Sequence, residues 1–482
     1  MNIQSTMRSA LGGENIESPL DHLARFVSGH SSVPDSVRNA ARRGLIDLLG
    51  VTVAGGADES MAPLIDYARA TYRNGVSTAV AMDEPMAPEA AALINAAAGH
   101  VLDFDDCYDP FGGHPSVVVL PPLLALGEAL DMPAQRILDA YAIGVEVTGV
   151  LGKTLNMTHY ERGWHPTATV GILGAAAGAA RLLGLEAEGV KRALGVAGAF
   201  AAGTKASFGT FLKPAQVGFA AARGLAAANL ARLGMDAPAF PVHGRHSFDT
   251  IFNGKAADWT PLAQLGSHWG MLDPGLSFKL YPCCGSTHAS IDAVRKIAGG
   301  RSLAAAARID IFVHPRRRPH TDRPHPTSST EAKFSLQYVV ATAALTGNVA
   351  LSDFEEAALR DPQRRSLLER IHVHDLAQDR WTLLPGRDDC FVAEVRATMS
   401  DGSLASGAML APRGWDAREP LTDEELETKF VDTIASMSER DAARKLLSLI
   451  GAWSSGVGGL RELMAEARAL VCAERRRHAR HS

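Results

Sequence analysis

Apolar residues recur at helical spacing over the first half of the chain and predict a bundle of helices. Two helices are expected within residues 18–53 and another over residues 60–72. The pattern continues with helices over residues 88–101, 115–130, 133–155, 166–183, 187–202 and 214–233. Proline opens several of these segments, as the first turn of a helix tolerates. Alanine and glycine are frequent in them, and such small side chains favour close packing of neighbouring helices.

The pattern changes near residue 275, where strands enter the chain. Residues 307–314 alternate between apolar and polar side chains, and residues 371–375 and 391–399 are also typical of strands. The dipeptide Asp401-Gly402 is a strong hairpin signal, so residues 403–410 are expected to return as the next strand of an antiparallel sheet. Helices are expected over residues 287–298 and 332–345, and again beyond residue 420.

These elements predict a mainly α protein with two domains. Residues 1–274 plus 411–482 would form a large all-helical domain from both ends of the chain. Residues 275–410 would form a smaller α+β domain inserted between them. A length of 482 residues agrees with two domains. Clefts between domains are common ligand sites.

Composition narrows the classes of function. A net charge of −5 gives no electrostatic footprint for a nucleic acid. No run of about 20 residues is both apolar and uncharged, and residues 1–18 lack the pattern of a secretory signal. We therefore expect a cytoplasmic protein that does not contact a membrane. The five cysteines form no C-x-x-C pair, which favours reduced thiols over a metal site. No phosphate-binding glycine motif occurs.

Residues 100–116 are the most informative stretch for chemistry. A helical pattern runs into four aspartates, a turn with Pro and two Gly follows, and His114 precedes the next helix. Asp103 and Asp106 would share a helix face if the helix continued that far. A carboxylate and an imidazole at a helix end can transfer protons. The alternative is a set of solvated carboxylates and a capping histidine.

Three further segments add a histidine and two lysines. His165 precedes Pro166 at another helix start, and Lys213 stands at the start of the helix that includes Pro214. A helix N-terminus attracts anions and disfavours a cation, so a bound carboxylate would suit both positions. Lys279 lies in an apolar stretch and would also find a partner in a carboxylate. A capping histidine, a surface lysine and a lysine that reaches water are the alternatives.

The remaining polar candidates carry less weight. Tyr338 shares a helix face with Ser335, and its hydroxyl group could donate to a carboxylate or bond to a backbone group within the core. The adjacent Cys283 and Cys284 are interpreted as packing residues. The run of arginines over residues 316–318 is interpreted as a solvated loop, with an anion-collecting rim as the minority view.

Taken together, these segments resemble the MmgE/PrpD family. The matching pieces are HVLDFDD at residues 100–106, HPS at 114–116, GWHPTAT at 163–169, LKPAQVG at 212–218, KLYPCCGSTH at 279–288 and FSLQYVVATA at 334–343. The resemblance implies a helical domain with a smaller α+β lid, a homodimer, no metal or organic cofactor, and a small di- or tricarboxylate as substrate. Family activities include 2-methylcitrate dehydration, cis-aconitate decarboxylation and iminodisuccinate epimerisation.

The resemblance to the decarboxylase branch also implies an active site. It would consist of Asp103, Cys107, His114, His165, Lys213, Lys279 and Tyr338. That branch has threonine where this chain has Cys107, and the segment DFDDCYDPFGGHPS departs from the dehydratase pattern. Both departures leave the exact substrate open.

The expected function is that of a lyase that moves a proton at a carbon next to a carboxylate. His114 and His165 are the expected acid/base pair. Lys213 and Lys279 would neutralise carboxylate and enolate-like charge. Asp103 would orient a histidine or hold a substrate hydroxyl, and Tyr338 would donate from the lid. An epimerase of a dicarboxylate is one alternative, and a non-catalytic carboxylate-binding protein is another.

Overall fold

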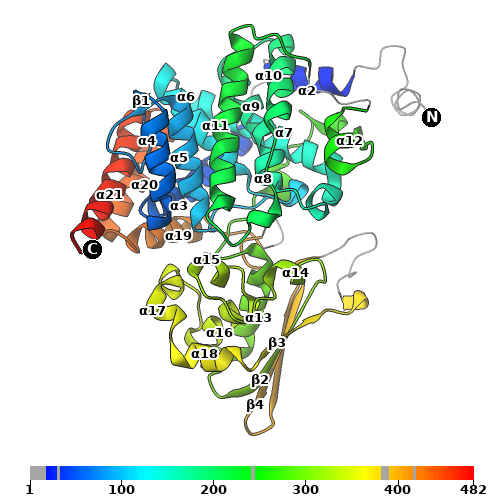
Figure 1. Ribbon diagram of the computed structural model, residues 1–482, viewed down its shortest axis with the longest axis vertical. Helices are drawn as coiled ribbons and strands as arrows, with labels where there is room; N and C mark the ends of the chain where they lie inside the picture. Colours follow the sequence, from blue (N-terminus) through cyan, green and yellow to red (C-terminus); the bar gives the residue numbers. More distant parts are fainter. Residues whose placement is uncertain (1–17, 30–32, 240–244, 381–389, 416–418, 482) are drawn as a thin grey trace.

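A computed structural model describes residues 18–29, 33–239, 245–380, 390–415 and 419–481 (Figure 1). Helices dominate, and one small sheet accompanies them, so the prediction of a mainly α protein is confirmed. Almost all of the N-terminal stretch searched for a secretory signal lies outside the described residues. Among the residues that are described, no helix is both long enough and apolar enough to cross a membrane.

The first part of the chain forms the predicted helical bundle. Its helices are α2 Pro19–Ser28, α3 Asp35–Gly56, α4 Ala62–Thr71, α5 Pro88–Val101, α6 Pro115–Leu130, α7 Ala134–Glu161, α8 Pro166–Thr169, α9 Gly171–Leu182, α10 Ala187–Phe200, α11 Leu212–Arg232 and α12 Phe248–Asn253; the short strand β1 spans Asn74–Ser77. Helices α5 and α6 have the predicted bounds. The single helix expected over residues 166–183 is instead two, because Val170 interrupts it between α8 and α9.

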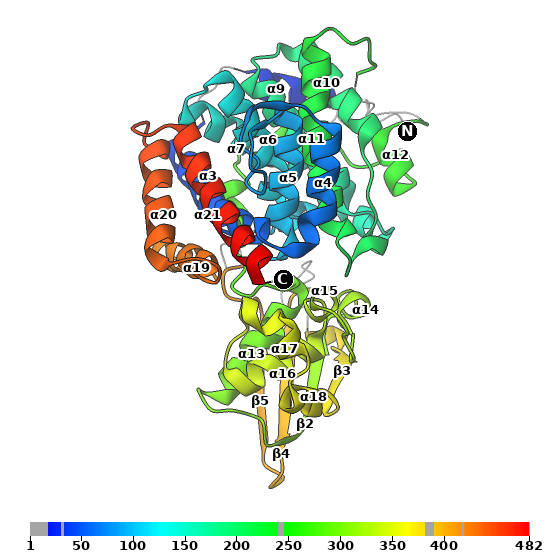
Figure 2. The ribbon, with the colours of Figure 1, turned by 60° about the vertical axis from the view of Figure 1, so that its left-hand side comes forward.

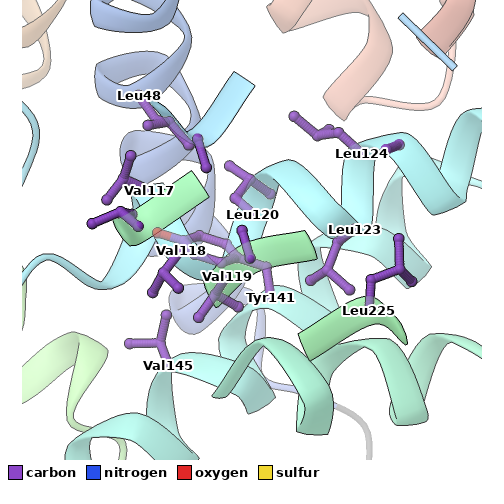
Figure 3. Close-up of a cluster of buried hydrophobic side chains, with 14 of the residues drawn as sticks. Leu48, Val117, Val118, Val119, Leu120, Leu123, Leu124, Tyr141, Val145 and Leu225 are labelled. Atoms are coloured by element: carbon purple, nitrogen blue, oxygen red, sulfur yellow. The ribbon is translucent and has the colours of Figure 1, made fainter. Parts of the chain in front are cut away.

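Small and branched apolar side chains hold the bundle together. Val117–Leu120 of α6 are buried against side chains from α3, α7 and α11, including Leu48, Tyr141 and Leu225 (Figure 3). Helices α5 and α11 approach so closely that a methyl group at Gly218 would lie 2.5 Å from the carbonyl oxygen of Leu93. Such packing leaves little room for movement, so groups at the ends of these helices are firmly positioned.

The strands form one four-stranded sheet in the order β3-β2-β4-β5. They span Ala306–Val313 (β2), Ile371–Asp375 (β3), Ala393–Met399 (β4) and Leu404–Met409 (β5). The expected hairpin is present, with Val395 opposite Gly407. The prediction of an antiparallel sheet is confirmed for β2, β4 and β5 but is wrong for β3, which runs parallel to β2. The long connection between these two strands allows a crossover, which a parallel pair requires.

Helices accompany the sheet, and the last helices return to the bundle (Figures 1 and 2). The first group is α13 His288–Ala298, α14 Arg318–Thr321, α15 Ser329–Ala332, α16 Leu336–Thr346, α17 Glu356–Leu359 and α18 Pro362–Leu368; the second is α19 Asp423–Ala435, α20 Arg440–Ser454 and α21 Leu460–His481. Thr422 and Glu425 form a capping box at the start of α19.

The buried apolar side chains form two separate clusters. One cluster combines the first helices with α19–α21, and the other combines the sheet with α13, α16 and α18. A buried ion pair ties α19 to α3, with Lys429 Nζ 2.5 Å from Asp47 Oδ1. The same ammonium group donates to the Phe104 carbonyl oxygen at 2.9 Å, so it also anchors the loop after α5. That the sheet-containing part acts as a lid stays a prediction.

Candidate active site

The loop after α5 begins with an unusual backbone conformation. The helix ends at Val101, and Asp103 adopts a positive φ of 53°, in the left-handed region. The sequence pattern allowed Asp103 and Asp106 to share a helix face. They do not share one, because the helix ends before it reaches them. Asp106 instead contacts the side chain of Ser116 in the first turn of α6. The turn thus sends neighbouring carboxylates to different partners.

Asp103 lies between the two predicted lysines. Its Oδ1 atom is 2.6 Å from Lys213 Nζ and 3.2 Å from Lys279 Nζ, and its carbonyl oxygen accepts from Lys279 at 2.7 Å. All three side chains are almost completely buried. Burial alone would raise the pKa of Asp103, but the two ammonium groups hold it well below its usual range. Two cations thus share one carboxylate. We expected Asp103 to orient a histidine or to hold a substrate hydroxyl, and the aspartate that lies beside the histidines is another one.

That other aspartate is Asp105. Its Oδ2 atom lies 2.8 Å from His100 Nδ1 and 3.2 Å from His114 Nδ1. His114 Nδ1 also lies 2.8 Å from the Asp106 carbonyl oxygen. Both neighbours of this nitrogen are acceptors, so Nδ1 carries the hydrogen and Nε2 is left for a ligand. Burial would raise the pKa of Asp105, but the two imidazoles lower it well below its usual value. Burial lowers the pKa of His100 to about 4, although Asp105 opposes this shift.

His165 is held in a neutral form. It precedes α8, and its Nδ1 atom lies 3.0 Å from Gln216 Oε1 on α11. The imidazole stacks on His100 with a centroid distance of 6.0 Å. Burial lowers the pKa of His165 well below its usual value, and the neighbouring His100 and Lys213 add to this effect. Nε2 of His165 is buried and has no hydrogen-bond partner within the described residues.

One cavity of about 390 Å³ brings these groups together. Six of the predicted site residues line it: Asp103, Cys107, His114, His165, Lys213 and Lys279. This volume lies within the range of small-molecule sites. The Sγ atom of Cys107 is 3.8 Å from His114 Nδ1. Burial raises the pKa of Cys107 well above its usual value, so the thiol is neutral and poorly suited to act as a nucleophile.

The structure does not bring Tyr338 to this cavity. Its hydroxyl group lies within the core of the sheet-containing part, where it donates to the Asp353 carbonyl oxygen at 2.5 Å and accepts from Arg364 at 2.6 Å. The catalytic role expected for Tyr338 has no support in this geometry. The alternative of a buried tyrosine with a backbone partner describes its surroundings, because both polar contacts of the hydroxyl group are made inside the protein.

Residues of the sheet-containing part also line the cavity. Among them are Cys284, Ser286, Arg316, Arg317, His320 and Phe334. The interpretation of residues 316–318 as a solvated loop is wrong for Arg317, whose guanidinium group faces this cavity and packs over the Phe391 ring at 4.1 Å. Cys283 points away from the cavity into the core and contacts Thr287. The packing interpretation therefore fits Cys283, whereas Cys284 lines the cavity.

The only described group with the arrangement of metal ligands is His100, Asp105 and His114, whose ligand atoms lie within 4.8 Å of one another. The N···O distances of 2.8 and 3.2 Å between the histidines and Asp105 are hydrogen-bond lengths. Each Nδ1 atom has an acceptor as its neighbour and so carries hydrogen, which a metal would have to displace. These residues fit a hydrogen-bonded network better than a metal centre.

Sequence reasoning overlooked three of these residues: His100, Asp105 and Gln216. A signal existed for His100, because a histidine in the last turn of an alanine-rich, buried helix needs a polar partner. Asp105 is one of several adjacent carboxylates, and only the left-handed turn at Asp103 decides which of them meets the histidines. Gln216 carried no distinguishing feature within the helical pattern of α11.

Comparisons with known proteins identify the family of this chain. The family models for the MmgE/PrpD N-terminal and C-terminal domains match residues 21–260 and 281–455. The chain belongs to the MmgE/PrpD family. It is 31% identical to a cis-aconitate decarboxylase of Mus musculus over 86% of each chain, and 31% identical to that of Homo sapiens over 88% of each. A cis-aconitate decarboxylase of Aspergillus terreus is 24% identical over 93% of this chain and 95% of its own length. This MmgE/PrpD protein is accordingly an enzyme of the lyase class.

Proposed function

We propose that this enzyme decarboxylates cis-aconitate or a closely similar tricarboxylate. The observation that carries the proposal is the arrangement of two lysines on Asp103 beside the His114–Asp105 pair, in one cavity. Such a cavity offers positive charge for carboxylates and an imidazole for proton transfer. The decarboxylase relatives support the choice of reaction among those known in the family.

The reaction needs one proton and no change of oxidation state. The bond between the departing carboxylate and its carbon breaks, and its electrons form a new double bond to the central carbon. The electrons of the original double bond move to the carbon next to another carboxylate. A proton added there completes the product, with CO2 released. The negative charge that develops resembles an enolate, and the ammonium groups of Lys213 and Lys279 would stabilise it in a site largely closed to water.

His114 is our candidate for the proton donor. The Asp106 carbonyl oxygen accepts from the Nδ1–H group of His114 at 2.8 Å and Asp105 lies 3.2 Å from the same nitrogen, which together orient the ring. Nε2 is then the nitrogen that delivers the proton. His165 is neutral because of its burial, so we assign its unpartnered Nε2 atom the task of accepting a hydrogen bond from a protonated substrate group. Cys107 would contact the substrate as a neutral thiol.

Three further properties belong to the same proposal. The enzyme would work without metal or organic cofactor, it would form a homodimer, and the sheet-containing part with its helices would act as a lid over the cavity. Activity that survives dialysis against EDTA would support the first property. Light scattering in solution would measure the second. Protection of the cavity cysteines from alkylation by bound substrate would support the third.

Proton NMR in D2O tests the function directly. Purified enzyme is incubated separately with cis-aconitate, 2-methylcitrate, citrate and racemic iminodisuccinate. We expect cis-aconitate to be consumed, with one deuterium at the carbon next to a carboxylate in the product. Turnover of another acid instead would assign the dehydratase or epimerase branch. Thermal stabilisation by an acid without any turnover would support the non-catalytic alternative and contradict the proposal.

A further inference from the structure

Among the three consecutive arginines at residues 316–318, Arg317 is the one without an acidic partner in the described structure. Arg316 lies 3.2 Å from a Glu161 carboxylate oxygen, and Arg318 lies 3.1 Å from Asp322. Arg317 instead reaches Cys390 Sγ at 2.8 Å and Ser286 Oγ at 3.5 Å. Its Nε atom is buried and makes no hydrogen bond within the described residues. A guanidinium group whose N–H donors are not all hydrogen-bonded can bind an anion.

Among the described residues, no carboxylate lies within ion-pair distance of Arg317, although the charge of Asp109 acts on its guanidinium group from further away. Asp109 lines the same cavity, but its carboxylate accepts from the Trp415 indole at 3.1 and 3.2 Å. His320 lies 3.1 Å from Ser286 Oγ, and burial together with the charge of Arg317 lowers the pKa of His320 to about 3. This histidine is therefore neutral near pH 7. The Phe391 ring below the guanidinium group supports its orientation without removing donors.

We infer that Arg317 and Ser286 form a second carboxylate subsite, which binds the end of the substrate opposite to the Lys213–Lys279 pair. The inference rests on the proposed function, since it concerns a polycarboxylate in the same cavity. The planar fork of an arginine binds a carboxylate through two parallel hydrogen bonds, and the Ser286 hydroxyl group can add a third. The enzyme then selects acids that carry carboxylates at both ends and rejects those that lack one.

Two acids that cannot react distinguish the loss of this subsite from a general effect of removing a positive charge from the cavity. Tricarballylate carries three carboxylates, and methylsuccinate is the same molecule with a methyl group in place of one terminal CH2-carboxylate. Binding of each acid is measured by isothermal titration calorimetry to the wild type, Arg317→Gln, Arg317→Lys and Arg318→Gln. Arg318→Gln is the matched control, because Arg318 is the adjacent arginine, does not line the cavity and pairs with Asp322.

We expect Arg317→Gln to weaken tricarballylate binding by about 10- to 100-fold, the range for a lost hydrogen bond to a charged group. Binding of methylsuccinate should change by less than about threefold, because a single terminal carboxylate is held by the lysines. Arg317→Lys should be intermediate for tricarballylate, since a lysine keeps the charge and loses the fork. Arg318→Gln should bind both acids as the wild type does.

Equal weakening of both acids by Arg317→Gln would overturn the inference, as would no weakening of either. These measurements do not depend on turnover. If the NMR experiment shows no reaction with any acid while the selective loss in Arg317→Gln is observed, the proposed function fails and the subsite stands. If cis-aconitate is turned over and the selective loss is missing, the proposed function stands and the inference of a subsite fails.

Discussion

The two ends of the cavity differ in how their charges are satisfied. At the inner end, Lys213 and Lys279 share Asp103, and His100 and His114 share Asp105. At the outer end, Arg317 has a thiol and a hydroxyl group as its polar neighbours. The inner groups are held in place before any ligand arrives, whereas the outer group gains its best partner from the ligand. We therefore propose that the inner end carries out the chemistry and that the outer end serves recognition.

The largest effect should come from removal of the proton donor at the inner end. We expect His114→Gln to lower kcat by about 100- to 10,000-fold, the usual contribution of a positioned acid or base. KM should change little, because the lysines and Arg317 remain. Steady-state kinetics with the substrate identified by NMR would measure both parameters.

His159→Gln is the control for His114→Gln. His159 is also a buried histidine, but it bonds to Thr169 and does not line the cavity. Its replacement should leave kcat per folded molecule within about threefold of the wild type, as expected for a group that does not touch the substrate. Full activity in His114→Gln would remove this residue from the mechanism.

The next largest effect should follow from removal of the shared carboxylate. Asp103→Asn keeps a residue type that tolerates a positive φ, but it leaves two buried ammonium groups beside each other. We expect the free energy of unfolding to fall by about 3–5 kcal/mol, as for other broken buried ion pairs. Urea denaturation would measure this change. Asp131→Asn offers a control, because Asp131 has a φ of 54° and is exposed at the end of α6. An equal, small loss in both variants would contradict the shared-carboxylate role.

Much of the fold could be predicted because proline and alanine mark its helices. Pro88 and Pro115 each open a helix at the predicted residue, since proline fits the first turn. The parallel pairing of β2 and β3 could not be predicted in the same way. The alternation of apolar and polar residues indicates which face of a strand is buried, but it does not indicate which other strand pairs with it. That choice depends on how the helices between β2 and β3 pack.

The residues of the candidate site could be predicted where a charged side chain stands at a position in the sequence that disfavours its charge. Lys213 and Lys279 are cations at positions where helix dipoles or apolar neighbours disfavour them, and both lie in the cavity. For Arg317 an anion-collecting rim was only the minority interpretation, because a basic, proline-rich segment has the composition of a solvated loop. That Asp105 and not Asp103 meets the histidines depends on one left-handed residue, which a run of aspartates does not reveal.

A smaller effect is expected from pH. The folded pKa of His100 is about 4, against a reference value of 6.5, so between these values the unfolded chain binds a proton that the folded chain does not. The free energy of unfolding should therefore fall as the pH decreases from 6.5 to 4. Asp103 and Asp105 have lowered pKa values, so their contribution is lost only at more acidic pH.

Urea denaturation at several pH values would compare the wild type with His100→Gln. The variant should reduce the slope between pH 4 and 6.5 by up to about 1.4 kcal/mol per pH unit, which corresponds to one proton. Gln can still donate a hydrogen bond to Asp105. The variant therefore tests the loss of the titratable imidazole ring and not the loss of the hydrogen bond. An unchanged slope would mean that His100 is protonated in the folded enzyme.

The smallest effect should come from Tyr338, which the sequence placed at the site and the structure places outside it. Tyr338→Phe removes a buried hydroxyl group that contacts Asp353 and Arg364, so the free energy of unfolding should fall by about 1–3 kcal/mol. The value of kcat/KM should stay within about twofold, because neither end of the cavity loses a group. Tyr67→Phe, at a position that is 44% exposed, should cost less than about 0.5 kcal/mol. A fall in kcat/KM of tenfold or more without a loss of stability would return Tyr338 to the active site and show that the sheet-containing part moves much closer to the inner end during turnover.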